Sequence, residues 1–229
     1  MQECPRCKSQ QFIKSGIVKE RQRYKCKDCA YHYTVSQKSD TSNQSQRRLA
    51  LTLYLEGLGF RSIGRILGFS HVAVYNWIKS FGEQIEAVKQ KEATIVEIDE
   101  MHSYVGNKKK YCWIWIAVDR LGKRFIHVVT GTRGIKTGQK LWNEIENPEN
   151  MELIATDYWK AYEAFIPQDK HIQSKAETFT VEGYNSLFRH FLARLRRKSK
   201  CYSKSETMLR RSVMLLMTKW NGELDDILN

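Results

Sequence analysis

The sequence predicts a mixed α/β domain over residues 93–229, preceded by a small cysteine-rich unit and a short all-helical unit. Three observations lead to this prediction. Two CxxC pairs lie within the first 30 residues, helical periodicity follows over residues 45–82, and strand-like runs alternate with helical ones after residue 93. A chain of 229 residues is long enough for one medium domain and one or two small ones.

The composition favours a polyanionic partner. The chain has 38 Lys and Arg against 25 acidic residues, which gives a net charge of +13. Such an excess favours nucleic acid, although a solvated basic surface is the simpler alternative. No apolar run is long enough to cross a membrane, and the first residues, MQECPRCKSQ, lack the apolar core of a secretory signal. We therefore expect a cytoplasmic protein with no membrane partner.

Residues 1–35 carry the pattern of a structural zinc site. Cys4 and Cys7 form one CxxC pair, and Cys26 and Cys29 form the other. Two tight turns that each present two thiolates complete the tetrahedron that Zn²⁺ prefers. A redox dithiol is the alternative, but it needs one CxxC on a helix, whereas both pairs here lie in turns. We predict a zinc ribbon with one structural Zn²⁺, which would supply folding energy.

Residues 45–82 predict three short helices after a polar, Ser-rich linker at 36–44. Gly57 and Gly68 end the first two helices, and Ser70 is a good N-cap for the third. A helix, a short turn and another helix form the pattern of a helix-turn-helix DNA-binding domain. An ordinary three-helix bundle is the alternative.

The apolar spacing assigns faces to these helices. The second helix is expected to bury Ile63, Ile66 and Leu67, and the third to bury Trp77 and Ile78 with either Val72 or Val74. This leaves five side chains of the third helix as candidates to face DNA: His71, Ala73, Tyr75, Asn76 and Lys79. Residues 83–92 are interpreted as a helical connector.

From residue 93 onward the pattern becomes α/β. Three strands joined by turns, over 93–100, 110–119 and 123–132, predict an antiparallel meander. There follow a helix over 135–146, a strand over 151–157, a helix that Pro167 ends, a short strand over 169–173, and helices over 178–200 and 205–221. This order of elements is that of an RNase H-like fold, which has a mixed five-stranded sheet and flanking helices. The order is three strands, a helix, a strand, a helix, a strand and then helices.

Two aspartates end strands of this predicted sheet. Asp99 ends the first strand and Asp157 ends the fourth, and these strands are neighbours in an RNase H-like sheet. Their carboxylates would meet at one edge, where α/β sheets place reacting groups. With a third carboxylate from a helix they would form an oxygen-rich pocket for Mg²⁺, and two such ions clamp the oxygens of a phosphoryl displacement. The alternative is that each aspartate merely caps the segment that follows.

The helix predicted over 178–200 offers the third acid. A helical wheel places Glu182 beside the apolar stripe, on a face that it shares with Asn185, Arg189, Arg196 and Lys200. These cations would bind successive phosphates of a DNA strand that passes the acid. Glu177 would point into the core if it belonged to the same helix, so we expect it to precede the helix.

These residues lie in motifs that resemble the insertion-sequence-one (IS-one) family of bacterial DDE transposases. The motifs are EIDEMHSYVG around Asp99, KYCWIWIAVDR after it, TDYWKAY at Asp157, and HIQSKAETFTVEGYN running on to KCYSKS. The resemblance covers nearly the whole chain: a four-cysteine ribbon, a helix-turn-helix and a DDE domain. Twenty-four residues separate Asp157 from Glu182, which is similar to the short spacing typical of the family. The resemblance therefore implies that Glu182 is the third acid.

The same resemblance implies a function. Asp99, Asp157 and Glu182 would bind two Mg²⁺ or Mn²⁺, with His171, Lys175 and Asn185 lining the site. The protein would act in bacteria, associated with the nucleoid, as a homodimer or larger assembly on double-stranded DNA. It would cleave 3′ ends at the terminal inverted repeats of its element and join them to target DNA. Gly183 departs from the family, which often has a basic residue there, but this removes no ligand.

Two other functions stay open at this stage. One is a transcription regulator that binds DNA without cutting it, and the other is a different RNase H-like nuclease or resolvase that hydrolyses without joining. Cys112 and Cys201 are interpreted as ordinary buried or surface thiols.

Overall fold

A computed structural model describes residues 3–18, 21–34, 43–85, 93–145 and 148–228. The chain divides into two compact units, Met1–Gln46 and Arg47–Asn229. Most of the predicted linker at 36–44 and of the predicted connector at 83–92 lies outside the described residues. The division of the chain at these two segments therefore stays a prediction.

The first unit is a three-stranded antiparallel sheet. Its strands, in spatial order, are β1 (Phe12–Val18), β2 (Arg21–Cys26) and β3 (His32–Thr34). The buried core consists of Cys4, Cys26 and Tyr33, and the rings of Phe12 and Tyr24 pack against it. Because so small a core removes little apolar surface from water, burial alone contributes little to the stability of this unit.

Three helices follow, and they begin and end close to where the sequence predicts. They are α1 (Gln44–Leu55), α2 (Phe60–Leu67) and α3 (His71–Ile85). Gly57 and Gly68 adopt φ of +91° and +74° at the ends of α1 and α2, a conformation that glycine tolerates best. Ser70 caps α3, since its Oγ accepts a hydrogen bond from the Ala73 amide at 3.1 Å.

The buried faces of α2 and α3 differ from the prediction at one position. Ile63 is buried and Leu67 packs against the core, but Ile66 is 60% exposed, so its predicted burial is wrong. The core side of this short helix is the row Phe60, Ile63, Leu67, and Ile66 lies off that row. On α3, Val74 is buried and Val72 is 54% exposed, which settles the alternative that the sequence leaves open.

The three helices share a hydrophobic core with the C-terminal helix α6 (Glu206–Trp220), which the short α7 (Leu224–Leu228) follows. Apolar residues of α1 and α3 lie in one cluster with Leu209, Val213 and Leu216 of α6. Tyr54 Oη donates a buried hydrogen bond to Ser212 Oγ at 2.7 Å. The helices that precede the sheet are thus packed into the same unit as the sheet.

The second unit contains a mixed five-stranded sheet in the order β6-β5-β4-β7-β8. The strands are β4 (Ile95–Tyr104), β5 (Tyr111–Asp119), β6 (Arg124–Gly131), β7 (Leu153–Thr156) and β8 (His171–Gln173). The first three are antiparallel, and β7 and β8 continue the sheet in parallel with β4. This arrangement fits the RNase H-like domain that the order of elements predicts.

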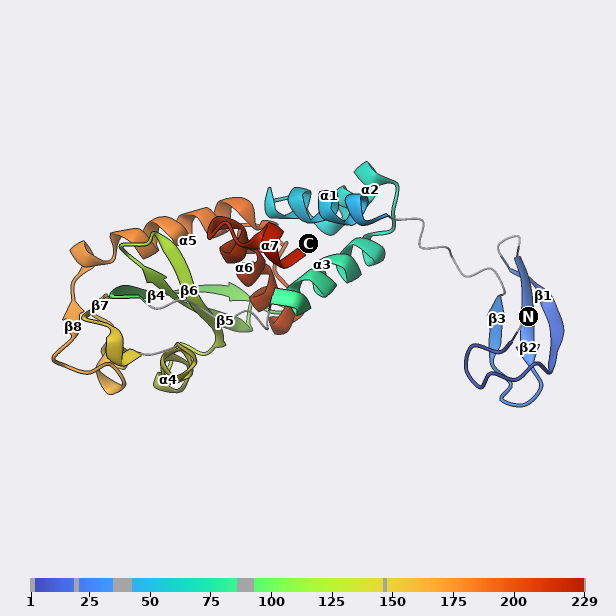
Figure 1. Ribbon diagram of the computed structural model, residues 1–229, viewed down its shortest axis with the longest axis horizontal. Coiled ribbons are helices and arrows are strands. Elements are labelled where there is room, and N and C mark those ends of the chain that lie inside the picture. Colours follow the sequence, from blue (N-terminus) through green and yellow to red (C-terminus); the bar gives the residue numbers. More distant parts are fainter. Residues whose placement is uncertain (1–2, 19–20, 35–42, 86–92, 146–147, 229) are drawn as a thin grey trace. The chain divides into compact units, whose positions relative to one another are not determined.

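Helices cover both faces of the sheet (Figure 1). Helix α4 (Ile135–Glu144) lies on one face, over a core that contains Val96, Ile98 and Trp115. Helix α5 (Phe179–Phe191) lies on the other face together with α6, over a core that contains Met101 and Ile116. Side chains of β4 therefore alternate between two environments, which decides where its acidic residues point. None of the helices in the described part of the chain has the length and hydrophobicity that a membrane span requires.

The helix predicted after Asp157 is instead a short 3₁₀ turn, η2 (Lys160–Ala164). The amides of Tyr162 and Phe165 donate to carbonyls three residues earlier, at Trp159 and Tyr162, with N–O distances of 3.2 Å. Tyr162 is fully buried and packs on Trp115. This long-range contact prevails over the local helical pattern.

The helix predicted over 178–200 ends at Phe191, and a 3₁₀ turn, η4 (Ala193–Leu195), follows it. Arg194 is the reason, since it turns into the core. Its Nη1 donates to Ser203 Oγ at 2.9 Å, and its guanidinium lies over the rings of Tyr54 and Phe60. Arg196 and Lys200 lie beyond the helix, so their predicted place on the helical face of Glu182 is wrong.

Candidate active site

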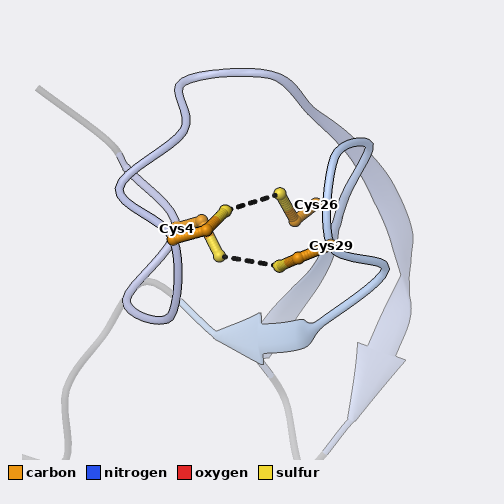
Figure 2. A group of neighbouring side chains, drawn as sticks. Cys4, Cys26 and Cys29 are labelled. Carbon is orange, nitrogen blue, oxygen red and sulfur yellow. Dashed lines mark hydrogen bonds between the residues drawn. The ribbon is translucent and has the colours of Figure 1, made fainter.

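The four predicted zinc ligands lie together at one end of the first unit. Cys4 Sγ is 3.7 Å from Cys29 Sγ, and Cys7 Sγ is 3.5 Å from Cys26 Sγ. All four sulfur atoms lie within 4.8 Å of one another. Figure 2 shows Cys4 on one side of the cluster, with Cys26 and Cys29 facing it. Zn–S bonds of about 2.3 Å in a tetrahedron place sulfurs about 3.8 Å apart, so the cluster fits one Zn²⁺.

Asp99 lies in the middle of β4, so the prediction that it ends a strand is wrong, whereas Asp157 directly follows the last residue of the neighbouring parallel strand β7. The register pairs Glu97 of β4 with Ala155 of β7. The pairing ends at these two residues, two positions before each aspartate, and the carboxylate of Asp157 contributes to the raised pKa of Asp99. Asp157 Oδ1 also accepts a hydrogen bond from the Trp159 amide at 2.9 Å, so it fixes the turn that follows β7 as well.

Helix α5 is anchored to β4 at its first turn by a buried carboxylate. Glu97 is fully buried, and its Oε2 accepts a hydrogen bond from the Val181 amide at 2.9 Å. Arg120 links Glu97 to Glu177, with N–O distances of 2.7 Å to each carboxylate. Glu177 lies in a 3₁₀ turn, η3 (Lys175–Glu177), so the prediction that it precedes the helix is confirmed. A carboxylate at a helix N-terminus also satisfies free amides and the helix dipole.

The next turn of α5 reaches Asp99 directly. Asn185 is only 4% exposed, and its Nδ2 donates to Asp99 Oδ2 at 2.6 Å. Its Oδ1 is buried and has no hydrogen-bond partner in the described structure. Glu182 lies one turn earlier on α5, three residues from Asn185, and its side chain is exposed. The helix therefore brings an acid and an unsatisfied carbonyl oxygen to the edge that holds Asp99 and Asp157.

The charges at this edge act on one another. Burial raises the pKa of Asp99 from 3.8 to about 6, and the carboxylates of Glu100, Asp157 and Glu182 contribute to the rise. A group of anions in a partly dry environment is unfavourable unless a cation or protons neutralise it. Among the described residues, however, only the four thiols form a group of potential ligands close enough to hold one ion. The carboxylates share an edge without converging on a single point.

Glu100, which is not among the predicted site residues, points to the opposite face of β4 from Asp99. Tyr162 Oη donates a short hydrogen bond to Glu100 Oε2, and Arg133 Nε lies 2.7 Å from Glu100 Oε1. The Arg133 guanidinium also lies over the rings of Trp113 and Trp159. This cluster ties the segment after Asp157 to β4. The strand alternation at Asp99-Glu100 is the signal that would have revealed it.

The three residues predicted to line the site, His171, Lys175 and Asn185, differ in how close they lie to the predicted catalytic acids. His171 is half-buried on β8, and its Nε2 lies 2.7 Å from Oγ1 of Thr156, which precedes Asp157. Lys175 is exposed in the turn before α5. Asn185 alone of the three contacts a predicted catalytic acid.

The predicted DNA-facing residues also differ in exposure. On α3, His71, Asn76 and Lys79 are exposed, whereas Ala73 and Tyr75 are half-buried and pack against the core. Arg189 is half-buried on α5, and Arg196 and Lys200 are exposed in the segment after it. Their role in DNA binding stays a prediction.

Comparison with known proteins identifies the family. A family model described as IS1 transposase matches residues 93–219, which contain the whole five-stranded sheet, α5 and α6 apart from its last residue. The chain belongs to the IS1 transposase family. The matched residues of this IS1 transposase domain include Asp99, Asp157 and Glu182, and the first unit lies outside them.

Curated members of the IS1 group are similar to this chain over about half its length. The Insertion element IS1 4 protein InsB of Escherichia coli (strain K12) is 38% identical over 109 residues, which are 48% of this chain and 65% of that protein. The Insertion element iso-IS1n protein InsB of Shigella dysenteriae is 33% identical over 113 residues, 49% of this chain and 86% of that protein. The Insertion element IS1 protein InsB of Shigella sonnei is 37% identical over 109 residues, 48% and 82% of the two chains.

Proposed function

We propose that this IS1-family protein cleaves the 3′ ends of its own insertion element and joins them to target DNA, using Asp99, Asp157 and Glu182. The observation that carries the proposal is the hydrogen bond between Asn185 Nδ2 and Asp99 Oδ2 at 2.6 Å. Through it the turn of α5 that bears Glu182 is held against β4, and the carboxylates of Asp157 and Glu182 both contribute to the raised pKa of Asp99. Three acids from three elements at one edge suit phosphoryl transfer.

The donor set fits a hard divalent cation such as Mg²⁺ or Mn²⁺. Carboxylate oxygens are the ligands that these ions prefer, and the buried Asn185 Oδ1, which lacks a partner, offers a further oxygen beside them. Asp99, Asp157 and Glu182 would hold the ions. When bound, two such ions stabilise the attacking and the leaving oxygens of an in-line displacement.

The chain's own residues would position the reacting groups. Glu97 and Arg120 fix the first turn of α5, and the Glu100–Arg133–Trp159 cluster fixes the turn that holds Asp157. In the first reaction water attacks a phosphodiester at the element end and frees a 3′-hydroxyl. In the second that hydroxyl attacks a target phosphodiester, and the target releases a 3′-hydroxyl of its own.

The basic helices and the first unit would hold the DNA. We assign recognition of the terminal inverted repeats to the zinc ribbon and to the exposed side of α3, where His71, Asn76 and Lys79 lie. Because two element ends have to be held together, the active form would be a dimer or a larger assembly. The net charge of +13 favours such an extended contact with DNA.

A strand-transfer assay tests this proposal. Labelled element ends, a target plasmid and Mg²⁺ are mixed with the full chain, and joined product is measured beside nicked product. We expect joining, and we expect Asp157→Asn to reduce it at least about 100-fold, because even the outer partners of metal ligands typically contribute 10- to 100-fold. Arg61→Gln, an exposed change on α2, serves as a control for nonspecific loss of charge.

The other outcomes separate the rival functions. Hydrolysis without joining would indicate a nuclease or resolvase, and specific binding without either reaction would indicate a regulator. Joining that survives Asp157→Asn would show that the acids are assigned wrongly.

A further inference from the structure

A basic pocket lies next to the candidate active site, and the proposed chemistry does not use it. It has a volume of about 370 Å³ and lies between the end of β4, the last turn of α5 and the segment that leads to α6. Its lining includes Lys108, Arg189, Arg197 and Lys198, and it contains no acidic residue. Among the described residues none of these four forms an ion pair, and none is paired with a hydrogen-bond acceptor.

Unpaired cations at such a site are unfavourable without a ligand. Arg189 is half-buried on α5, one turn after Asn185. Burial lowers the pKa of the Arg189 guanidinium and the positive charge of Arg197 lowers it further, whereas the carboxylate of Asp99 raises it by a smaller amount. An anionic ligand would relieve this repulsion, and the guanidinium group matches the geometry of phosphate with paired hydrogen bonds. Arg194, which also lines the pocket, is engaged with Ser203 and Met208 and serves the fold.

Aromatic side chains extend from this pocket along β4 and β5. Tyr202 and Tyr104 line the pocket, with ring centroids 6.2 Å apart, and Tyr104 lies 5.0 Å from Tyr111. His102 is 5.1 Å from Trp113, with which it is paired across the strands. Tyr111 is 55% exposed, so the row is open to solvent at its centre.

The row ends at the proposed catalytic edge. Arg133 lies over Trp113 at 4.7 Å and over Trp159 at 4.3 Å, and the Trp159 amide is bonded to Asp157. The pairing of β4 with β7 ends at Glu97, so the later part of β4 has no strand partner on that side in the described structure. His102 follows Asp99 by three residues on β4, about 10 Å along the strand, and points to the face of Glu100 rather than to that of Asp99. The distance along the strand is close to the rise of three stacked nucleotides.

We propose that this pocket and its aromatic row bind an unstacked nucleotide of the DNA strand that passes the three acids. Its phosphate would lie on Arg189 and Arg197, and its base would stack on Tyr104 and the rings beside it. Bases inside a duplex are already stacked on one another, so only an unpaired or extruded base can use these rings. This inference rests on the proposed function, because the position of the bound nucleotide is defined relative to the phosphodiester that the three acids would cleave.

Binding measurements without metal test the proposal independently of catalysis. The protein is the full chain with the substitution Asp99→Asn. One probe is a blunt DNA duplex, and the other is the same duplex with a single-stranded extension of five thymidines. Fluorescence anisotropy measures the affinity for each probe. We expect the extension to strengthen binding at least about five-fold, since stacking of one base typically contributes that much or more. Tyr104→Leu should abolish the gain, whereas Tyr104→Phe should retain it because the ring is kept.

Charge is tested with a matched pair of variants. Arg197→Ala should reduce the gain from the extension, whereas Lys136→Ala, an equal loss of charge on exposed α4, should not. Replacement of one thymine by photoreactive 5-iodouracil should crosslink the extension to peptides that contain Tyr104 or Tyr202. No gain from the extension, an unchanged gain in Tyr104→Leu, or crosslinks confined to residues 3–34 would overturn the proposal. Loss of strand transfer with this binding intact would instead count against the proposed function.

Discussion

The two candidate metal sites of this protein are assembled to different degrees. The four thiols of the first unit lie within 4.8 Å of one another, close to the spacing of a zinc tetrahedron. The acids of the second unit share one sheet edge but do not form such a group. A thiol that keeps its proton tolerates the close approach of other sulfurs, whereas burial and, to a lesser extent, repulsion by nearby carboxylates raise the pKa of Asp99.

The scaffolds around the two sites explain the difference. The first unit has a core of three buried residues, so its metal would act mainly as a folding element. The second unit has two large cores on either side of a sheet, and burial of this much apolar surface is a source of folding energy that the first unit lacks. Its metal would therefore serve chemistry, and the acids are held in place by Glu97, Arg120 and Asn185.

Removal of zinc should have the largest effect, and it should be confined to the first unit. We expect chelation or Cys26→Ser to unfold residues 3–34, because structural zinc typically contributes about 10 kcal/mol or more of binding energy that is also folding energy. Hydrogen exchange measures this directly. The exposed Cys201→Ser is the control and should leave exchange unchanged. Persistent protection of residues 3–34 without metal would show that the small core suffices.

The anchor of α5 gives the next largest effect. Arg120→Ala leaves the fully buried Glu97 without its cation, and loss of one partner of a buried pair typically costs about 3–5 kcal/mol. Lys140→Ala breaks an exposed pair with Glu144 on α4 and should change stability by less than about 1 kcal/mol. Urea unfolding compares the two variants. Equal effects would mean that Glu97 and Arg120 do not fix the helix.

The burial of Asp99 among other acids predicts a stabilising substitution. Since the pKa of Asp99 is raised to about 6, its ionisation opposes folding above that pH, and the penalty disappears as pH falls below 3.8. Asp99→Asn should therefore stabilise the metal-free protein by about 1–3 kcal/mol at pH 7.5, with the gain shrinking between pH 6 and 4. Thermal unfolding across this range measures it. A destabilising effect at pH 7.5 would contradict the electrostatic account.

The smallest effect concerns Gly183, next to Glu182. A methyl group at this position meets no atom within 4 Å, so Gly183→Ala should stabilise α5 by about 0.5–1 kcal/mol. Gly64→Ala on α2 is the opposite case, because its methyl would lie 2.6 Å from the Phe69 carbonyl oxygen. Chemical denaturation should show a gain for the first and a loss for the second. A loss of stability in Gly183→Ala together with a gain in Gly64→Ala would mean that α5 is not helical next to Glu182.

Local signals in the sequence predict much of this architecture. The structure confirms the helix ends at Gly57 and Gly68, the cap at Ser70 and the clustering of the cysteines of the two CxxC pairs. Each of these signals involves residues that are near one another in the chain. The parallel pairing of β4 with β7 also agrees with the predicted strand order.

Features that depend on distant contacts escape such signals. The early end of α5 depends on Arg194, which bonds to Ser203 and lies over Tyr54. The 3₁₀ turn at Lys160–Ala164 depends on Tyr162 reaching Glu100. The basic pocket is formed only because α5 ends where it does and the chain turns back toward β4. The contacts of Arg194 with Tyr54 and of Tyr162 with Glu100 join residues that are far apart in sequence.

Iron-mediated cleavage of the polypeptide tests the central claim most directly. Fe²⁺ takes the place of Mg²⁺ at oxygen-rich sites and, with peroxide and ascorbate, cuts the backbone next to the bound ion. With the first unit zinc-loaded, we predict cuts near Asp99, Asp157 and Glu182, suppressed by excess Mg²⁺ and absent in Asp157→Asn. Cuts at only one of the three acids, or cuts that persist in Asp157→Asn, would contradict a shared metal centre.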